Sequence, residues 1–299
     1  MKKQNDIQWY EVRLTHVGEL RGALINRLFE LGVDGVFEPE KIDMVLGYCR
    51  WDRREIVARS FAEYLASLRA LFPFSEYIGF EIVLCDNKDW SESYREAFRA
   101  QPIAKRFFLI PLWDTVTLAA AGRIPLIMEA GQAFGTGLHA TTRLCLAALE
   151  TTIADLENPE TTRLLDVGTG TGILGIAAEK LGVGSVCAVD NDPVAVEQAQ
   201  LNCERNHCRR IRVSLDDLST IREPFNIVVA NILLETHQDL AAQYKRLLAP
   251  GGVLLISGLL GGQREEMCEC LKTLNLVADH SYAMQEWVAL GYRHSRGVS

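Results

Sequence analysis

The sequence has no long hydrophobic run, no paired cysteine motif and no excess of basic charge. No stretch reaches the ~18 uninterrupted apolar residues that a membrane-spanning helix requires, and no apolar segment follows Lys2-Lys3 as in a secretory signal. The eight cysteines form no Cys-x-x-Cys, and no four-ligand metal site can be assembled from them. These absences argue against membrane insertion, secretion and bound zinc, and we expect a cytoplasmic protein.

Acidic residues outnumber basic ones by 39 to 31, which gives a net charge of −8. A large nucleic-acid footprint requires basic patches, so direct binding of nucleic acid is not expected. An acidic surface suits a basic protein partner, through electrostatic steering. The length of 299 residues, at roughly 150 residues per domain, predicts two globular domains.

The first 86 residues predict a small α+β domain. Strand-like segments cover residues 8–14, 33–38, 44–51 and 77–85, and amphipathic helical segments cover 17–31 and 53–72. This β-α-β-β-α-β order is that of the ferredoxin-like unit. Residues 87–125 are interpreted as a connector, with a short helix at 90–100 and extended segments at 106–113 and 116–120.

Residues 126–299 predict an α/β domain. From Leu164 onward strand-like and helix-like segments alternate, which indicates a parallel sheet with helices on both faces. Residues 165–172 read Leu-Asp-Val-Gly-Thr-Gly-Thr-Gly and lie between a predicted strand and a predicted helix, as a nucleotide-binding loop requires. Glycines such as Gly168 let the backbone turn sharply and approach a ligand closely.

Two acidic residues accompany this loop and indicate the ligand. Asp190 ends the next predicted strand, 22 residues after Gly168, where a carboxylate can accept hydrogen bonds from both hydroxyls of a ribose. Asp166 precedes the loop and would suit a ligand ammonium group. A dinucleotide places a pyrophosphate at the helix N-terminus, whereas S-adenosylmethionine offers an ammonium group instead, so the pattern favours the methyl donor over NAD. The alternative for Asp190 is that it only caps the following helix.

Asn231 ends a later predicted strand, within residues 228–233, Val-Val-Ala-Asn-Ile-Leu. Ligands of open α/β sheets bind beyond the carboxyl ends of the strands. The side-chain carbonyl of Asn231 can accept a hydrogen bond from an attacking amine, and its amide can bind the cofactor. An ordinary turn asparagine is the alternative.

Residues 133–142, Ala-Phe-Gly-Thr-Gly-Leu-His-Ala-Thr-Thr, add the most specific motif. Together with the glycine loop and the Asn-Ile-Leu segment, they closely resemble the ribosomal protein L11 methyltransferase family, which modifies amino groups of a large-subunit ribosomal protein. The resemblance extends over nearly the whole chain, including Asp89-Trp90, residues 111–113 (Pro-Leu-Trp) and residues 286–290 (Glu-Trp-Val-Ala-Leu).

The resemblance implies a class I methyltransferase sheet that binds S-adenosylmethionine, and an N-terminal domain that recognises the substrate protein and reorients on a flexible linker. The cofactor contacts that it implies are Thr142, Gly168, Asp190 and Asn231. The Phe-Gly-Thr-Gly loop would close near the reacting amine, with Phe134 packing there.

His139 would then orient the loop; the alternative is a loop or helix-start residue without chemistry. The sequence departs from the family at Ala140, where proline is common, in the connector residues 98–102, and after the Asn-Ile-Leu segment, where it continues Leu-Glu-Thr-His to His237. These departures affect the substrate-facing surface more than the cofactor site.

Methyl transfer requires a neutral amine, and a lysine has a reference pKa of about 10.4. A nearby sulfonium and an apolar pocket both disfavour the ammonium form, so we expect no dedicated base, with Asn231 orienting the amine. Two further hypotheses remain open: a methyltransferase for another protein lysine or a small molecule, and a cofactor-binding protein without catalysis. The intact set of Asp166, Asp190, Asn231 and Thr142 argues against the last.

Overall fold

The computed structural model describes residues 9–33, 35–37, 43–50, 53–85, 99–114, 122–129, 137 and 139–294. The chain divides into two compact units, residues 1–98 and 99–299, and each is considered by itself. Among the described residues, none of the helices combines the length and the apolar character needed to cross a membrane.

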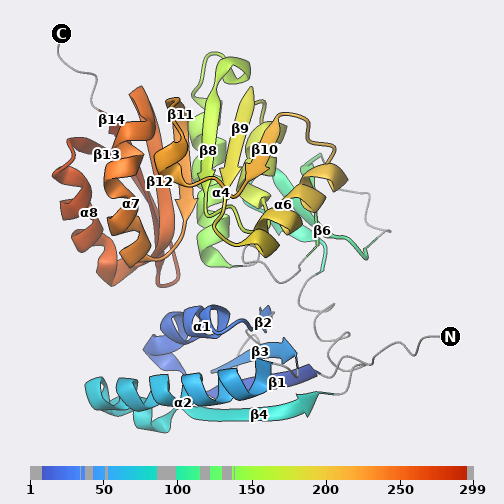
Figure 1. The fold of residues 1–299 in the computed structure, drawn as a ribbon, viewed down its shortest axis with the longest axis vertical. Coiled ribbons are helices and arrows are strands. Elements are labelled where there is room, and N and C mark those ends of the chain that lie inside the picture. Colours follow the sequence, from blue (N-terminus) through green and yellow to red (C-terminus); the bar gives the residue numbers. More distant parts are fainter. Residues whose placement is uncertain are drawn as a thin grey trace. The chain divides into compact units, whose positions relative to one another are not determined.

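The first unit has the predicted β-α-β-β-α-β order (Figure 1). Its elements are β1 (Trp9–Thr15), α1 (Arg21–Glu30), β2 (Gly35–Phe37), β3 (Met44–Arg50), α2 (Arg54–Leu71) and β4 (Gly79–Cys85). The strands form an antiparallel sheet in the order β2-β3-β1-β4, which confirms the ferredoxin-like prediction. Its core is fully buried, because alternate residues of β1 meet the apolar faces of both helices; it includes Val12, Leu14, Leu24, Leu28 and Phe61.

The second unit begins inside the range expected to be a connector. A three-stranded sheet, β5-β6-β7, consists of Gln101–Ile103, Phe107–Pro111 and Ile124–Met128. The extended segment predicted at 106–113 therefore exists as β6, while the helix predicted at 90–100 and the strand predicted at 116–120 fall mostly or wholly outside the described residues. Described residues from Arg99 onward belong to the second unit rather than to a free connector.

A seven-stranded sheet in the order β10-β9-β8-β11-β12-β14-β13 forms the centre of the second unit (Figure 1). Its strands are β8 (Arg163–Val167), β9 (Ser185–Val189), β10 (Ile211–Ser214), β11 (Phe225–Asn231), β12 (Leu248–Leu260), β13 (Leu276–Met284) and β14 (Trp287–His294). Five adjacent strands are parallel, as predicted. The sheet is mixed, however, because β13 and β14 are joined by a two-residue turn, which forces them to be antiparallel, and β14 then pairs antiparallel with β12.

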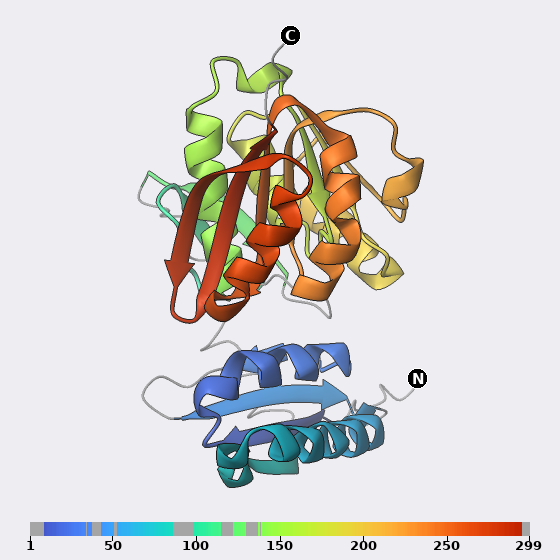
Figure 2. The ribbon, with the colours of Figure 1, turned by 90° about the vertical axis from the view of Figure 1, so that its left-hand side faces the viewer.

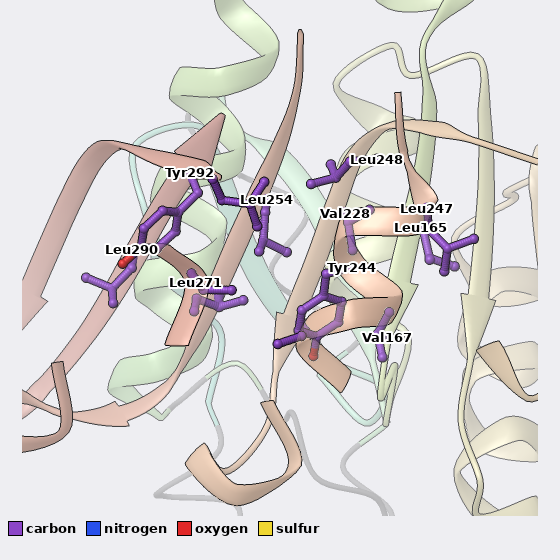
Figure 3. Packing of buried hydrophobic residues seen from close by; sticks show 14 of the residues in the cluster. Leu165, Val167, Val228, Tyr244, Leu247, Leu248, Leu254, Leu271, Leu290 and Tyr292 are labelled. Carbon is purple, nitrogen blue, oxygen red and sulfur yellow. The ribbon is translucent and has the colours of Figure 1, made fainter. Parts of the chain in front are cut away.

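Five helices cover this sheet: α4 (Ala140–Ala154), α5 (Ile173–Lys180), α6 (Pro193–Arg205), α7 (Leu234–Leu247) and α8 (Arg264–Lys272). Figure 2 shows α7 and α8 side by side on one face, and α4, α5 and α6 follow one another on the other. The core beneath α7 and α8 is apolar and includes Leu165, Val228, Tyr244, Leu254 and Leu271 (Figure 3). This packing fixes the strands whose carboxyl ends carry the predicted site.

Candidate active site

The glycine loop follows β8 and precedes α5, at the carboxyl edge of the parallel strands. Gly168 and Gly172 have φ angles of +66° and +83°, which side chains other than glycine rarely adopt. A Cβ atom at position 168 would lie 2.6 Å from Cγ2 of Ile232, so the loop also approaches the segment after β11 closely. The amides of Gly168 and Thr169 both donate to the Val189 carbonyl, which anchors the loop to the end of β9.

Asp190 joins the second strand to this loop. One carboxylate oxygen accepts a hydrogen bond from the Gly170 amide at 2.9 Å, and the other accepts one from the Asp192 amide at 3.1 Å. The cap of α6 is Asp192, whose carboxylate accepts from the Val194 amide at 2.9 Å. The alternative that Asp190 serves as the helix cap is therefore wrong, and Asp190 faces the glycine loop.

Asp166 has a different environment from the one expected. Its side chain is 0% exposed, and one oxygen accepts hydrogen bonds from the Thr169 hydroxyl at 2.7 Å and the Gly175 amide at 3.1 Å. Burial raises the pKa of Asp166 to about 6, although these two bonds oppose the shift, and the charge of Asp190 adds to it. The bonded oxygen links the glycine loop to the first turn of α5. The other oxygen, Oδ1, is buried and has no hydrogen-bond partner among the described residues, so the expected contact with a ligand ammonium stays a prediction.

Asn231 and Thr142 come together from positions 89 residues apart. The Asn231 amide nitrogen lies 3.4 Å from the Thr142 hydroxyl. Thr142 belongs to α4 and is 1% exposed. The carbonyl oxygen of Asn231 is buried and has no hydrogen-bond partner among the described residues. A buried acceptor left without a donor is costly, so this oxygen is suited to receive one from a ligand.

His139 is the N-cap of α4, and its Nδ1 lies 2.7 Å from the Thr141 hydroxyl. Its ring packs edge-on against Trp287, with 4.9 Å between the ring centroids. Burial lowers the pKa of His139 to about 4, so the ring is neutral near pH 7. The geometry is that of a helix-start residue. Phe134 lies outside the described residues, so its predicted packing stays a prediction.

Asn202 in α6 connects two parts of the site and was missed from the sequence. Its side chain is 0% exposed, donates to the Thr171 carbonyl at 3.0 Å and accepts from the Glu129 amide at 3.1 Å. Glu129 follows β7 and precedes the signature motif at residues 133–142. One buried amide thus links the glycine loop to Glu129, the residue that follows β7. No sequence signal indicated this role, because Asn202 lies within an amphipathic helix.

Exposed apolar residues flank Asp190 and were also missed. Leu215 directly follows β10 and is 54% exposed, and Val194 in the first turn of α6 is 43% exposed. The Asp190 amide donates to the Ser214 carbonyl at 3.2 Å, so Leu215 adjoins Asp190 along the edge of the sheet. The signal in the sequence was an apolar residue placed directly after a strand, between polar neighbours.

Comparisons with known proteins agree with this arrangement. A family model described as ribosomal protein L11 methyltransferase (PrmA) matches residues 8–295. The chain is 38% identical over 239 residues to the ribosomal protein L11 methyltransferase of Syntrophotalea carbinolica, covering 80% of this chain and 77% of the relative. It is 30% identical over 312 residues to that of Geobacillus kaustophilus, covering 95% and 98%.

Among solved structures, the crystal structure of ribosomal protein L11 methylase from Lactobacillus delbrueckii subsp. bulgaricus is similar, with a TM-score of 0.60 and 27% identity. The match covers 66% of this chain and 99% of that one. This likeness confirms the predicted methyltransferase fold of the second unit.

Proposed function

Because the chain belongs to the ribosomal protein L11 methyltransferase family, as the match over residues 8–295 shows, we propose that it transfers the methyl group of S-adenosylmethionine to amino groups of ribosomal protein L11. The amino groups are lysine side chains, the N-terminal amine, or both. We place the reaction in the cytoplasm and assign recognition of the protein substrate to the N-terminal unit, without direct contact to nucleic acid. The observation that carries the proposal is the unpartnered Asn231 oxygen beside a glycine loop bound by Asp190.

The residues at the carboxyl edge fit S-adenosylmethionine. Gly168 lacks the Cβ that would lie 2.6 Å from Cγ2 of Ile232, so the backbone of the glycine loop can lie close to the segment that begins at Asn231. Asp190 is partly exposed and keeps acceptor capacity for both ribose hydroxyls, because each carboxylate oxygen has more than one lone pair. Thr142 and Asn231 would lie at the methionine end. When bound, the cofactor supplies an activated methyl group on a positively charged sulfur.

We place the adenine ring between the apolar side chains of Val194 and Leu215, on either side of Asp190. Replacing Leu215 with aspartate is expected to raise the Kd for S-adenosylmethionine about tenfold, because it removes apolar contact worth about 1.5 kcal/mol. Isothermal titration calorimetry measures the change. The matched control is Val277→Asp, an equally exposed apolar residue on β13 (58% exposed), which should leave the Kd unchanged. Equal effects at both positions would remove Leu215 from the site.

The protein's chemical task at the amine is orientation. The Asn231 oxygen accepts one N–H of the neutral amine, which directs the nitrogen lone pair toward the methyl group. The amine would bind Asn231 in its neutral form, after its proton has left to water, because a positively charged group nearby would disfavour the ammonium form. The other end of the Asn231 amide makes one long hydrogen bond, of 3.4 Å, to the Thr142 hydroxyl.

Purified protein should transfer label from methyl-tritiated S-adenosylmethionine to unmodified ribosomal protein L11. The test mixture contains ribosomal proteins from a strain that lacks this activity, and the Asp190→Ala variant serves as the inactive control. Mass spectrometry of the labelled protein then identifies the modified amines. Absence of label on L11, with cofactor binding intact by calorimetry, would rule out this substrate and leave a methyltransferase of another protein or a small molecule.

A further inference from the structure

A buried polar chain lies directly behind Asn231. It consists of His237 and Tyr244 on α7 and Ser257 on β12, and all three side chains are 0% exposed. Figure 3 shows Tyr244 on α7 within the apolar core that faces the sheet. Imidazole and hydroxyl groups are costly to bury in such surroundings unless each is hydrogen-bonded, so the arrangement needs an explanation.

The hydrogen bonds define the state of the imidazole. Nε2 of His237 lies 2.8 Å from the Ser257 carbonyl oxygen, and Nδ1 lies 3.1 Å from the Tyr244 hydroxyl. A carbonyl only accepts, so Nε2 carries the proton and donates, while Nδ1 accepts from Tyr244. Burial lowers the pKa of His237 to about 4, which keeps the ring neutral and this arrangement intact near pH 7.

The Ser257 carbonyl connects this chain to the proposed reaction centre. It also accepts the Ile232 amide at 3.1 Å, and Ser257 is the register partner of Asn231 between β12 and β11. The hydrogen bond to Ser257 therefore fixes the turn that begins at Asn231, because Ile232 is the first residue after β11.

A glycine on the other side closes this turn. Gly258 has a φ angle of +89°, and a Cβ there would lie 2.1 Å from the Ile232 carbonyl oxygen. The Ile232 backbone is thus packed against Gly258 and bonded to Ser257, with little freedom to shift. Asn231 inherits its orientation from this backbone, because its own side chain makes one long hydrogen bond, of 3.4 Å, to Thr142.

We propose that His237 is a positioning residue for methyl transfer: through the Ser257 carbonyl and the Ile232 backbone, it fixes the orientation in which Asn231 receives the amine. This inference rests on the role of Asn231 proposed above. His237 lies six residues after Asn231. It touches neither cofactor nor amine, so its effect is on the rate of the transfer step.

Three variants test the proposal with ribosomal protein L11 as substrate. His237→Leu removes the donor, and kcat should fall about tenfold or more, since small misplacements of reacting groups are costly. His237→Gln places an amide nitrogen where Nε2 was, so it should recover most of kcat. Tyr244→Phe frees Nδ1 and allows the other tautomer, which should give an intermediate kcat. In each variant the Kd for S-adenosylmethionine, measured by calorimetry, should change less than about threefold, because the glycine loop and Asp190 are not touched.

Asn231→Ala separates this inference from the proposed function. If Asn231→Ala lowers kcat but His237→Leu does not, His237 has no positioning role and the role of Asn231 stands. If Asn231→Ala leaves kcat unchanged, both assignments are wrong. Parallel loss of cofactor binding and thermal stability in the His237 variants, without recovery in His237→Gln, would show a purely structural residue. If His237→Leu does not fold, His237→Gln and Tyr244→Phe decide the question.

Discussion

Replacing Asp190 with alanine should raise the Kd for S-adenosylmethionine about 100-fold or more. The carboxylate would accept both ribose hydroxyls, and hydrogen bonds to a charged group contribute about 1.5–3 kcal/mol each. The same carboxylate holds the Gly170 amide at 2.9 Å, so its removal also frees the loop that must contact the ligand. Calorimetric titration measures the loss of affinity, and the tritium assay measures the accompanying loss of kcat/KM.

Asp192 is the matched control, two residues away. Its carboxylate caps α6 through the Val194 amide at 2.9 Å and does not contact the glycine loop through any bond found in the described residues. Asp192→Ala should cost about 1 kcal/mol of stability, as lost N-caps do, with little change in cofactor Kd. Similar Kd values for the two variants would contradict the assignment of the ribose to Asp190.

Strand ends were the most predictable part of the site. Parallel strands bring their carboxyl ends to one edge, so a residue placed at the end of a strand-like segment can be assigned to that edge without any tertiary knowledge. Asp190 and Asn231 are found there, each directly after or at the end of its strand. The sequence predicts the position of such a residue better than the direction in which its side chain points. Asp166 is an example, because its carboxylate turns inward and is bonded to Thr169 and Gly175.

Helix α4 was missed because its sequence has no polar face. Eleven of its 15 residues are buried, including Thr141, Thr142 and Glu150, so the amphipathic periodicity that identifies surface helices is absent. Glu150 is buried because its carboxylate accepts the backbone amides of Lys105 and Arg106, at 3.0 and 2.6 Å. Such a carboxylate is indistinguishable from a solvated one in the sequence.

The short strands β5 and β7 were equally hidden. Three or five residues give no periodicity to read, and Pro125 in β7 argues against a strand when neighbours are unknown. The structure explains β7 through its neighbours: Asn206, the C-cap of α6, donates to the Ile127 carbonyl at 2.6 Å and accepts from the Ile127 amide at 3.0 Å. These two side-chain hydrogen bonds satisfy the backbone groups of Ile127 that a second neighbouring strand would otherwise bind.

Packing explains the motif at residues 286–290. Trp287 is 3% exposed and contacts His139 and Ala140, so the ending segment of the chain supports the N-terminal end of α4. Thr142 lies in the first turn of that helix and contacts Asn231. The sequence shows these segments as separate motifs, and only the fold reveals that one supports the other.

Gly168→Ala should reduce cofactor affinity about tenfold or more and lower kcat as well. Two costs combine at this position. The φ angle of +66° disfavours alanine by roughly 1–2 kcal/mol, and the new Cβ would lie 2.6 Å from Cγ2 of Ile232. Relief of that contact must displace either the glycine loop or Ile232, which adjoins Asn231. Calorimetry measures how displacement of the glycine loop changes the Kd for S-adenosylmethionine. Steady-state kinetics with ribosomal protein L11 measure how displacement of Asn231 changes kcat.

Two comparisons separate the backbone cost from the contact. Gly122 has a similar φ of +79°, but a Cβ there would meet none of the described residues within 4 Å, so Gly122→Ala should lower stability without changing Kd or kcat. The double variant Gly168→Ala/Ile232→Ala lacks the contact but keeps the cost of the positive φ angle. Compared with Ile232→Ala alone, it should lose much less affinity for S-adenosylmethionine than Gly168→Ala loses compared with the wild type. If the double variant binds no better than Gly168→Ala, the loop conformation itself, rather than its contact with the Asn231 segment, governs cofactor binding.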